Sequence, residues 1–337
     1  MTSPATTATS PAPASDAATG PANSPATGPA GSPATGPADS PATTPTRSSA
    51  TGEPTVVLIH GAFANSFSFA PLQAALSARG VRSAALDLPG HGFATTSPAA
   101  YQSPQDLEAL ASAPSAMAGI SHTDTVTHLA EAVASIRAHG PVIALAHSRG
   151  GAALTSAANA RPELFDHLVF ASAWAPVDLD AAAYNAEPEM AGVDNAVLAS
   201  LLVGNPGELG ALRCNFRAAA GEQFAALKDL FGADRSDDEF RTFLGLFQTD
   251  EGLDAGGADD RAQAGTWGRI PRTFLRLGAD RSIPPAMQDR LIAEGDALTP
   301  ENPYRVRTLD SSHLGWLIDP AEAARAIADI VAEVRAG

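Results

Sequence analysis

One serine in the sequence lies where its hydroxyl group could act as a nucleophile. Ser148 belongs to AHSRGG (146–151), which joins an apolar run to an alanine-rich stretch typical of a helix. A sharp strand-to-helix turn leaves no room for large side chains two positions before and after the serine, and Ala146 and Gly150 meet this condition. Such a turn exposes the hydroxyl at a helix N-terminus, which favours developing negative charge. The predicted chemistry is attack on a carbonyl group.

A serine hydroxyl needs a base, which is itself oriented by an acid. Downstream of Ser148 the sequence contains two histidines, His167 and His313. His167 begins a predicted strand, at the edge of the sheet opposite to Ser148, and we interpret it as a surface residue. His313 follows the last predicted strand, at the carboxyl edge where sheets of this kind bind ligands. His313 is therefore the predicted base.

Two aspartates are candidates for the acid. Asp280 directly follows the predicted strand 271–278, at the same carboxyl edge as His313. Asp178 comes shortly after the predicted strand 168–173 and is the alternative. The chain order serine, acid, histidine is expected for this fold, and its position directly after a strand favours Asp280.

Backbone amides that could hold an oxyanion follow the first predicted strand. In HGAF (60–63), Gly61 allows the backbone to bend toward the serine turn. The amide of Ala62 is then expected to pair with that of Arg149, with Phe63 as the alternative first donor. The Arg149 side chain could reach an anionic substrate group, but pairing with a neighbouring carboxylate is the favoured interpretation.

Other histidines beside these motifs have structural interpretations. His60 and His147 flank the site from strand ends and are expected to support loops, while His91 lies in the tight turn DLPGHG. No set of histidine, cysteine and carboxylate residues has a metal-ligand spacing that fits this fold, so no metal is predicted. The sequence also has no glycine-rich phosphate loop or dinucleotide fingerprint.

Short apolar runs and helical stretches alternate from residue 55 onward, which predicts an α/β fold with a mostly parallel sheet flanked by helices. The predicted strands cover 55–60, the start of 81–92, 142–148, 168–173, 271–278 and 304–310, and helices are predicted at 69–79, 121–139, after Ser148 and at 320–335. Residues 175–266 do not alternate in this way. Helical patches at 195–203, 222–231 and 237–247 predict a helical cap over the site.

The first part of the sequence has a different composition. Residues 1–54 consist almost wholly of Ala, Pro, Thr, Ser and Gly, with the repeats SPATGPAG, SPATGPAD and SPATTPTR. Such a segment lacks the apolar side chains that offset ordering entropy, so it is predicted to be a disordered tail before one domain at 55–337. It has no basic and apolar regions of a secretory signal, and Cys214 is the single cysteine. A cytoplasmic location is expected.

The net charge of −16 argues against nucleic acids and membranes as partners, because acidic surfaces repel phosphates. A small-molecule substrate and a monomer or homodimer are expected instead.

Five motifs taken together resemble the α/β-hydrolase superfamily over nearly all of residues 55–337: HGAF, DLPGHG, AHSRGG, DRSIPPAMQ (280–288) and SSH (311–313). Within it, Asp280-x-x-Ile-Pro followed by Gln288 is similar to the plant methylesterase and hydroxynitrile-lyase group and its bacterial relatives. The resemblance implies an α/β-hydrolase fold with a cap, an enzyme without a cofactor, and Asp280 as the acid.

Residues at two positions separate the activities within that group. The lyases have Thr at the position of Gly61 and Lys at that of Leu314, so the resemblance favours hydrolysis here. Ser148 differs from the aspartate nucleophile of epoxide hydrolases and haloalkane dehalogenases. The expected function is hydrolysis of a small or medium ester or lactone. Alternatives are C–C hydrolysis, amide hydrolysis or perhydrolysis with the same triad, or ligand binding without turnover. The expected pocket residues are Phe63, Phe67, Trp174, Leu314 and Trp316.

Overall fold

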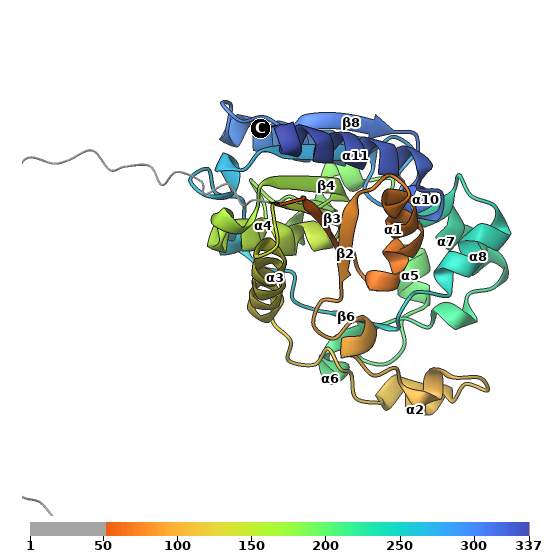
Figure 1. Cartoon of the computed structure of the whole chain (residues 1–337). Helices are drawn as coiled ribbons and strands as arrows, with labels where there is room; N and C mark the ends of the chain where they lie inside the picture. The colour runs from red at the N-terminus through yellow and green to blue at the C-terminus, as the bar shows by residue number, and fades with distance from the viewer. Residues whose placement is uncertain (1–51, 337) are drawn as a thin grey trace, which may run out of the picture. The chain divides into compact units, whose positions relative to one another are not determined.

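Six strands form one sheet in the computed structural model, which describes residues 52–336 (Figure 1). The strand order is β2-β1-β3-β4-β7-β8, and each neighbouring pair is parallel. The strands cover β1 (Thr55–Ile59), β2 (Arg82–Leu86), β3 (Val142–Ser148), β4 (His167–Ala173), β7 (Arg272–Leu277) and β8 (Arg305–Leu309). The predicted α/β class with a mostly parallel sheet is confirmed.

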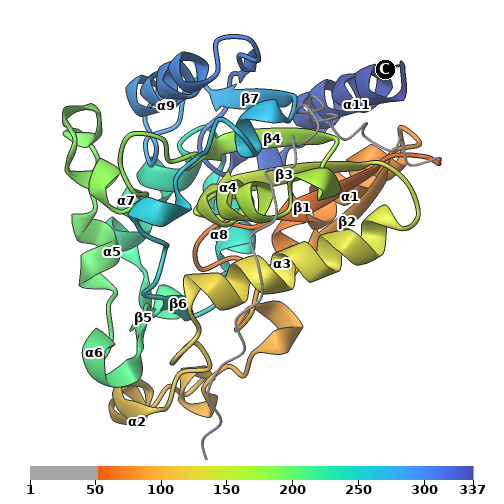
Figure 2. The same cartoon turned by 90° about the vertical axis from the view of Figure 1, so that its left-hand side faces the viewer.

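Helices cover both faces of this sheet (Figure 2). They are α1 (Ala70–Ser77), α3 (His122–Arg137), α4 (Gly150–Ala160), α9 (Pro285–Leu298), α10 (Gly315–Ile318) and α11 (Ala321–Ala336). Because side chains alternate along a strand, β1 contributes to two cores. Val57 and Ile59 belong to the core that contains residues of α3, α4 and α9. Val56 and Leu58 belong to the core that contains residues of α1 and α11.

Local sequence sets the ends of these helices. Ser121 accepts a hydrogen bond from the Asp124 amide while the Asp124 side chain accepts one from the Ser121 amide, which is a complete capping box at the start of α3. After α1 the chain turns at Gly80, whose φ of +71° suits glycine.

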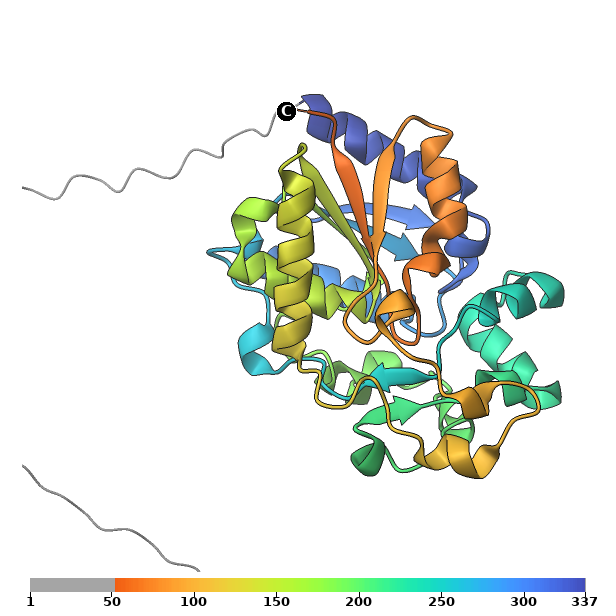
Figure 3. The ribbon, with the colours of Figure 1, turned by 60° about the horizontal axis from the view of Figure 1, so that its bottom comes forward.

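An insertion between β4 and β7 forms the cap region. It contains α5 (Ala196–Ser200), α6 (Pro206–Leu209), α7 (Gly221–Gly232) and α8 (Asp237–Leu244), and α5, α7 and α8 overlap the three predicted helical patches. Two short strands that the sequence did not indicate, β5 (Ala211–Arg213) and β6 (Asp250–Gly252), pair antiparallel. A further helix, α2 (Leu107–Ser112), lies beside this pair (Figure 3), and the Arg213 side chain bonds the Leu110 carbonyl.

The insertion contacts the loops that follow β1 and β8. The rings of Phe63 and Phe216 lie 5.3 Å apart, and the Leu314 amide donates to the Phe231 carbonyl at 2.8 Å. Within the described part of the chain, no helix is long and apolar enough to cross a membrane. The predicted tail at 1–54 falls outside the described residues except for residues 52–54.

Candidate active site

Ser148 is the last residue of β3, and α4 begins two residues later. Its φ of +53° lies in the left-handed region, which side chains other than glycine rarely occupy, so the turn is strained. The surrounding backbone is packed closely. A Cβ at Gly150 would lie 2.4 Å from the His60 carbonyl oxygen, and one at Gly61 would lie 2.8 Å from the Ser148 Cβ. These glycines allow the loop after β1 to lie directly against the serine turn.

His313 and Asp280 form a buried pair at the same edge of the sheet. His313 Nδ1 lies 2.6 Å from Asp280 Oδ2. The other carboxylate oxygen accepts hydrogen bonds from the Ser282 and Ile283 amides at 2.7 and 3.0 Å. This pairing directs His313 Nε2 away from Asp280, which is the arrangement that a histidine base requires.

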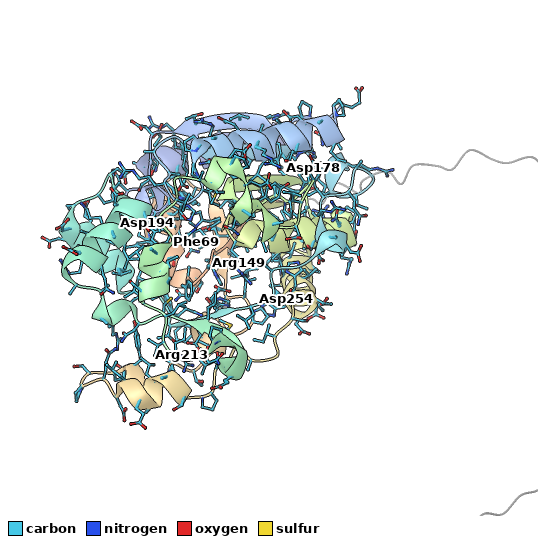
Figure 4. The ribbon with its side chains drawn as sticks, turned by 180° about the vertical axis from the view of Figure 1, so that it is seen from behind. Phe69, Arg149, Asp178, Asp194, Arg213 and Asp254 are labelled. Atoms are coloured by element: carbon cyan, nitrogen blue, oxygen red, sulfur yellow. The ribbon has the colours of Figure 1, made fainter. Side chains whose placement is uncertain are left out.

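Asp178, the alternative acid, is exposed at the surface. Figure 4 shows it away from Arg149, the residue that follows Ser148. Its amide contacts Tyr184 and its carbonyl accepts from Arg261, so local contacts hold it outside the site.

A serine that sequence reasoning missed completes the surroundings of Asp280. Ser172 Oγ donates to Asp280 Oδ2 at 2.6 Å from the end of β4, and Ser172 has a φ of +38°. Nothing in the sequence around ASAW (171–174) indicated this role, because the contact joins residues 108 positions apart.

His147 brings the elbow and the histidine loop together. Its ring centroid lies 4.5 Å from that of His313 and 5.4 Å from that of Trp316. Burial, together with the nearby His313, holds the pKa of His147 well below its ordinary value, so the ring is neutral. A neutral ring can pack against His313 without opposing a positive charge on it. These contacts agree with the supporting role that the sequence predicts for His147.

Among residues 52–336, no hydrogen-bond partner is found for the backbone amides of Ala62 and Arg149, the two expected donors. The amide of Phe63, the alternative donor, is engaged: it donates to Glu251 Oε2 at 2.7 Å. Of the three expected donors, Ala62 and Arg149 thus have amides free to bind a ligand, whereas Phe63 does not.

The side chain of Arg149 turns away from the serine toward β6. Its Nε lies 3.3 Å from Glu251 Oε1, and its Nη2 donates to the carbonyls of Gly252 and Asp254 at 2.9 and 2.6 Å. The favoured interpretation, pairing with a neighbouring carboxylate, matches these contacts.

His60 supports the loop after β1 in a neutral form. Its Nδ1 faces the Gly61 carbonyl at 2.9 Å, and its Nε2 accepts from the Leu88 amide at 3.2 Å. One nitrogen must donate and the other accept, which fits an uncharged ring. Burial and the neighbouring His91 lower the pKa of His60 to about 4.

A cavity of about 130 Å³ opens beside Ser148, His313 and Ala62. Its walls are mostly apolar, and the aromatic residues that line it are Phe63, Phe69, Phe216, Phe231, Phe243 and Phe247. Several of these phenylalanines belong to the insertion, and none of those was among the expected pocket residues. Of the expected pocket residues, Phe63 and Leu314 line this cavity.

The other three expected pocket residues need correction, because each packs elsewhere. Phe67 is 44% exposed and its ring contacts Phe93. Trp174 stacks on Tyr184 in the core beside α4 and α9. Trp316 lies behind His147 and donates from Nε1 to the His313 carbonyl at 3.1 Å, so it supports the histidine loop from outside the cavity.

Fold and site together define a protein with a strained serine turn at the carboxyl edge of a parallel α/β sheet. The profile of the alpha/beta hydrolase family matches residues 56–327, and the chain belongs to this family. A comparison with curated proteins finds no match.

Solved structures share this fold. A pyrethroid hydrolase from Sphingobium faniae JZ-2 is 20% identical, with 83% of this chain and 98% of that one covered and a TM-score of 0.59. Polyneuridine aldehyde esterase is also 20% identical, covering 82% and 99% with a TM-score of 0.61. Tomato methylketone synthase I is 20% identical, covering 84% and 100% with a TM-score of 0.55. The predicted resemblance is confirmed at the level of the fold.

Proposed function

We propose that this protein is a serine hydrolase that cleaves small or medium, mostly apolar carboxylic esters or lactones through an acyl-enzyme. One observation carries the proposal. Ser148, His313 and Ala62 lie together at one phenylalanine-lined cavity, and His313 is paired behind it with the buried Asp280.

In the proposed reaction, Ser148 Oγ attacks the carbonyl carbon while His313 Nε2 takes its proton. The oxyanion receives hydrogen bonds from the Ala62 and Arg149 amides, which are already oriented before the substrate arrives. His313 then protonates the leaving alkoxide, the C–O bond breaks, and the acyl group stays on Ser148. Water activated by His313 cleaves the acyl-enzyme and restores the serine.

An apolar substrate is favoured by the composition of the cavity wall. Six phenylalanine side chains line it, and among residues 52–336 no carboxylate or guanidinium group does. A charged substrate would lose its hydration there without gaining a partner of opposite charge. The esterase and hydrolase names of the similar structures agree with this class of reaction.

The test measures hydrolysis of p-nitrophenyl esters of increasing acyl length by the wild type and by Ser148→Ala. We expect the variant to lose at least about a thousandfold in kcat/KM. Ser156→Ala is the matched control, because Ser156 is a buried serine that contacts His122 at 2.8 Å and lies outside the cavity lining.

Labelling with a fluorophosphonate separates the remaining functions. Labelling of Ser148 without ester hydrolysis points to an amide, C–C or peroxide substrate. Folded wild-type protein that is neither labelled nor active on esters contradicts the proposal and indicates ligand binding without turnover.

A further inference from the structure

One carboxylate of the cap insertion is buried against the loops that hold the two oxyanion amides. Glu251, in β6, is 4% exposed. Its Oε2 accepts from the Phe63 amide at 2.7 Å and lies 3.3 Å from His91 Nε2. Its Oε1 accepts from the Gly252 amide at 2.9 Å and lies 3.3 Å from Arg149 Nε. Each oxygen thus contacts at least one group from outside β6.

These contacts keep the carboxylate charged. Burial alone would raise the pKa of Glu251, but the His91 hydrogen bond, the Arg149 charge and the Phe63 amide lower it to about 2. A buried charge is tolerated only with partners of this kind, and loss of one partner leaves the others uncompensated. The geometry of the cluster is therefore fixed by several mutually dependent contacts.

Phe63 is held on both sides by the same stretch of the insertion. The Gln248 amide donates to the Phe63 carbonyl at 2.9 Å, while Glu251 binds the Phe63 amide. Asn65 Nδ2 donates to the Leu246 carbonyl at 3.1 Å. We call residues 246–251 the clamp segment, because it binds the loop after β1 at three points.

Phe63 needs this support because of its backbone conformation. Its φ is +54°, in the left-handed region, which costs a non-glycine residue of its size free energy. Rotation about the Phe63 N–Cα bond is the φ rotation, so a partner that fixes the amide resists relaxation of the strained angle. Ala62, whose amide is the first proposed oxyanion donor, directly precedes Phe63.

Arg149 links the clamp segment to the second donor. Its backbone amide is available at the serine turn while its side chain is tied to Glu251, Gly252 and Asp254. Figure 4 shows Arg149 and Asp254 close together near the centre of the view. A single carboxylate thus touches the residue next to Ala62 and the side chain of Arg149.

We propose that Glu251 is a positioning residue for the oxyanion hole, fixing the spacing of the Ala62 and Arg149 amides from the cap insertion. This inference rests on the proposed serine hydrolase function. It assigns to the cap a role in catalysis that is separate from covering the pocket.

The test compares Glu251→Gln with Asp250→Asn. Asp250 is the neighbouring residue in β6, is also buried, and pairs with Arg213 at 2.6 Å without contacting either oxyanion loop. In Glu251→Gln the side chain keeps its shape but loses the charge that holds Arg149. We expect kcat for a p-nitrophenyl ester to fall about tenfold or more with KM changed less than about threefold, because oxyanion contacts act in the transition state. Asp250→Asn is expected to lower the Tm and keep kcat within about twofold.

A second readout addresses the oxyanion directly. Phenylboronic acid forms a B–O bond with Ser148 Oγ and becomes a tetrahedral anion while the hydroxyl proton passes to His313, whereas benzyl alcohol is a neutral probe of similar size that forms no anion. In Glu251→Gln we expect the inhibition constant of the boronic acid to rise about tenfold and that of benzyl alcohol to stay within about twofold. Where Glu251→Gln does not fold, Arg149→Met, which removes the other half of the ion pair and keeps the backbone amide, is measured in its place.

Three outcomes overturn the inference. The first is a wild-type kcat in folded Glu251→Gln, the second an equal loss of kcat in Asp250→Asn, and the third a parallel change in the inhibition constants of both inhibitors. Each would show that Glu251 has no positioning role, while the proposed serine hydrolase function would stand. A wild type without any reaction that depends on Ser148 removes the proposed function and this inference together.

Discussion

Ser172 Oγ donates a hydrogen bond of 2.6 Å to Asp280 Oδ2, the same oxygen that lies 2.6 Å from His313 Nδ1. The carboxylate is therefore held by four donors when the two amides on Oδ1 are included. A carboxylate fixed in this way keeps the histidine ring in one orientation. Ser172 has a φ of +38° at the end of β4, so a strained backbone positions its hydroxyl group beside Asp280.

Two variants at Ser172 separate the hydrogen bond from the strain. Ser172→Ala removes the bond and keeps the strain, whereas Ser172→Gly removes both. Because a hydrogen bond to a charged group contributes about 1.5–3 kcal/mol, we expect kcat to fall about tenfold in both variants. Thermal unfolding should place Ser172→Gly above Ser172→Ala in Tm. Wild-type kcat in both would contradict a role for Ser172 in orienting Asp280.

Asp280→Asn tests the assignment of the acid. An amide in place of the carboxylate favours the wrong tautomer of His313, and in a triad this change lowers kcat by about 10⁴-fold. Asp178→Asn is the control, since Asp178 is exposed and lies away from the cavity lining. Ester hydrolysis measured at one pH for both variants decides which of the two aspartates is the acid. A large loss in Asp178→Asn would reverse the assignment.

The buried His60 predicts a loss of stability on mild acidification. Its pKa is about 4 in the folded protein and 6.5 ordinarily, so between these values the unfolded chain binds more protons than the folded one. Protonation then favours unfolding, and stability falls as pH drops from 6.5 toward 4. At pH 5 the loss from His60 is about 2 kcal/mol relative to pH 7.

Urea unfolding at pH 7 and pH 5 measures this difference. His147 acts in the same direction, because its pKa is also lowered by burial. His60→Gln is expected to reduce the difference between the two pH values by about 2 kcal/mol. An undiminished difference in that variant would show that His60 is not the source.

Phe231 is predicted to limit the size of the substrate. Its ring centroid lies 5.8 Å from that of His313, and it lines the cavity from the end of α7. Phe231→Ala should shift the ratio of kcat/KM for long against short acyl esters by about tenfold, since one methylene in an apolar pocket is worth about 1–3 kcal/mol. Phe93→Ala, at a side chain 84% exposed, is the control and should keep the wild-type ratio. Equal ratios in all three proteins would exclude Phe231 from selectivity.

The elements and the main site residues were predictable because their evidence is local. A continuous run of small and branched residues predicted β3 at 142–148, and small residues around Ser148 indicated the turn. Ser172 and Glu251 could not be found in this way. Their contacts with Asp280 and Phe63 span 108 and 188 residues, and no local pattern encodes such a distance.

The wrong prediction of Trp174 and Trp316 as pocket residues has a related cause. Trp174 and Trp316 follow strand ends near the site, but a large side chain there can turn toward the pocket or toward the core with the same sequence. Packing against Tyr184 and His147 decides the direction, and those neighbours are known only once the chain is folded.

The clamp segment also affects the order in which the protein matures. The Phe63–Glu251 contact joins residues 188 positions apart, and contacts between segments so far apart form slowly because a long loop must close first. A refolding chain is therefore expected to gain its sheet before the proposed hydrolase activity. After dilution from urea, recovery of activity should lag behind recovery of the far-ultraviolet circular dichroism signal. Hydrolysis would then measure when the insertion packs against the loop after β1.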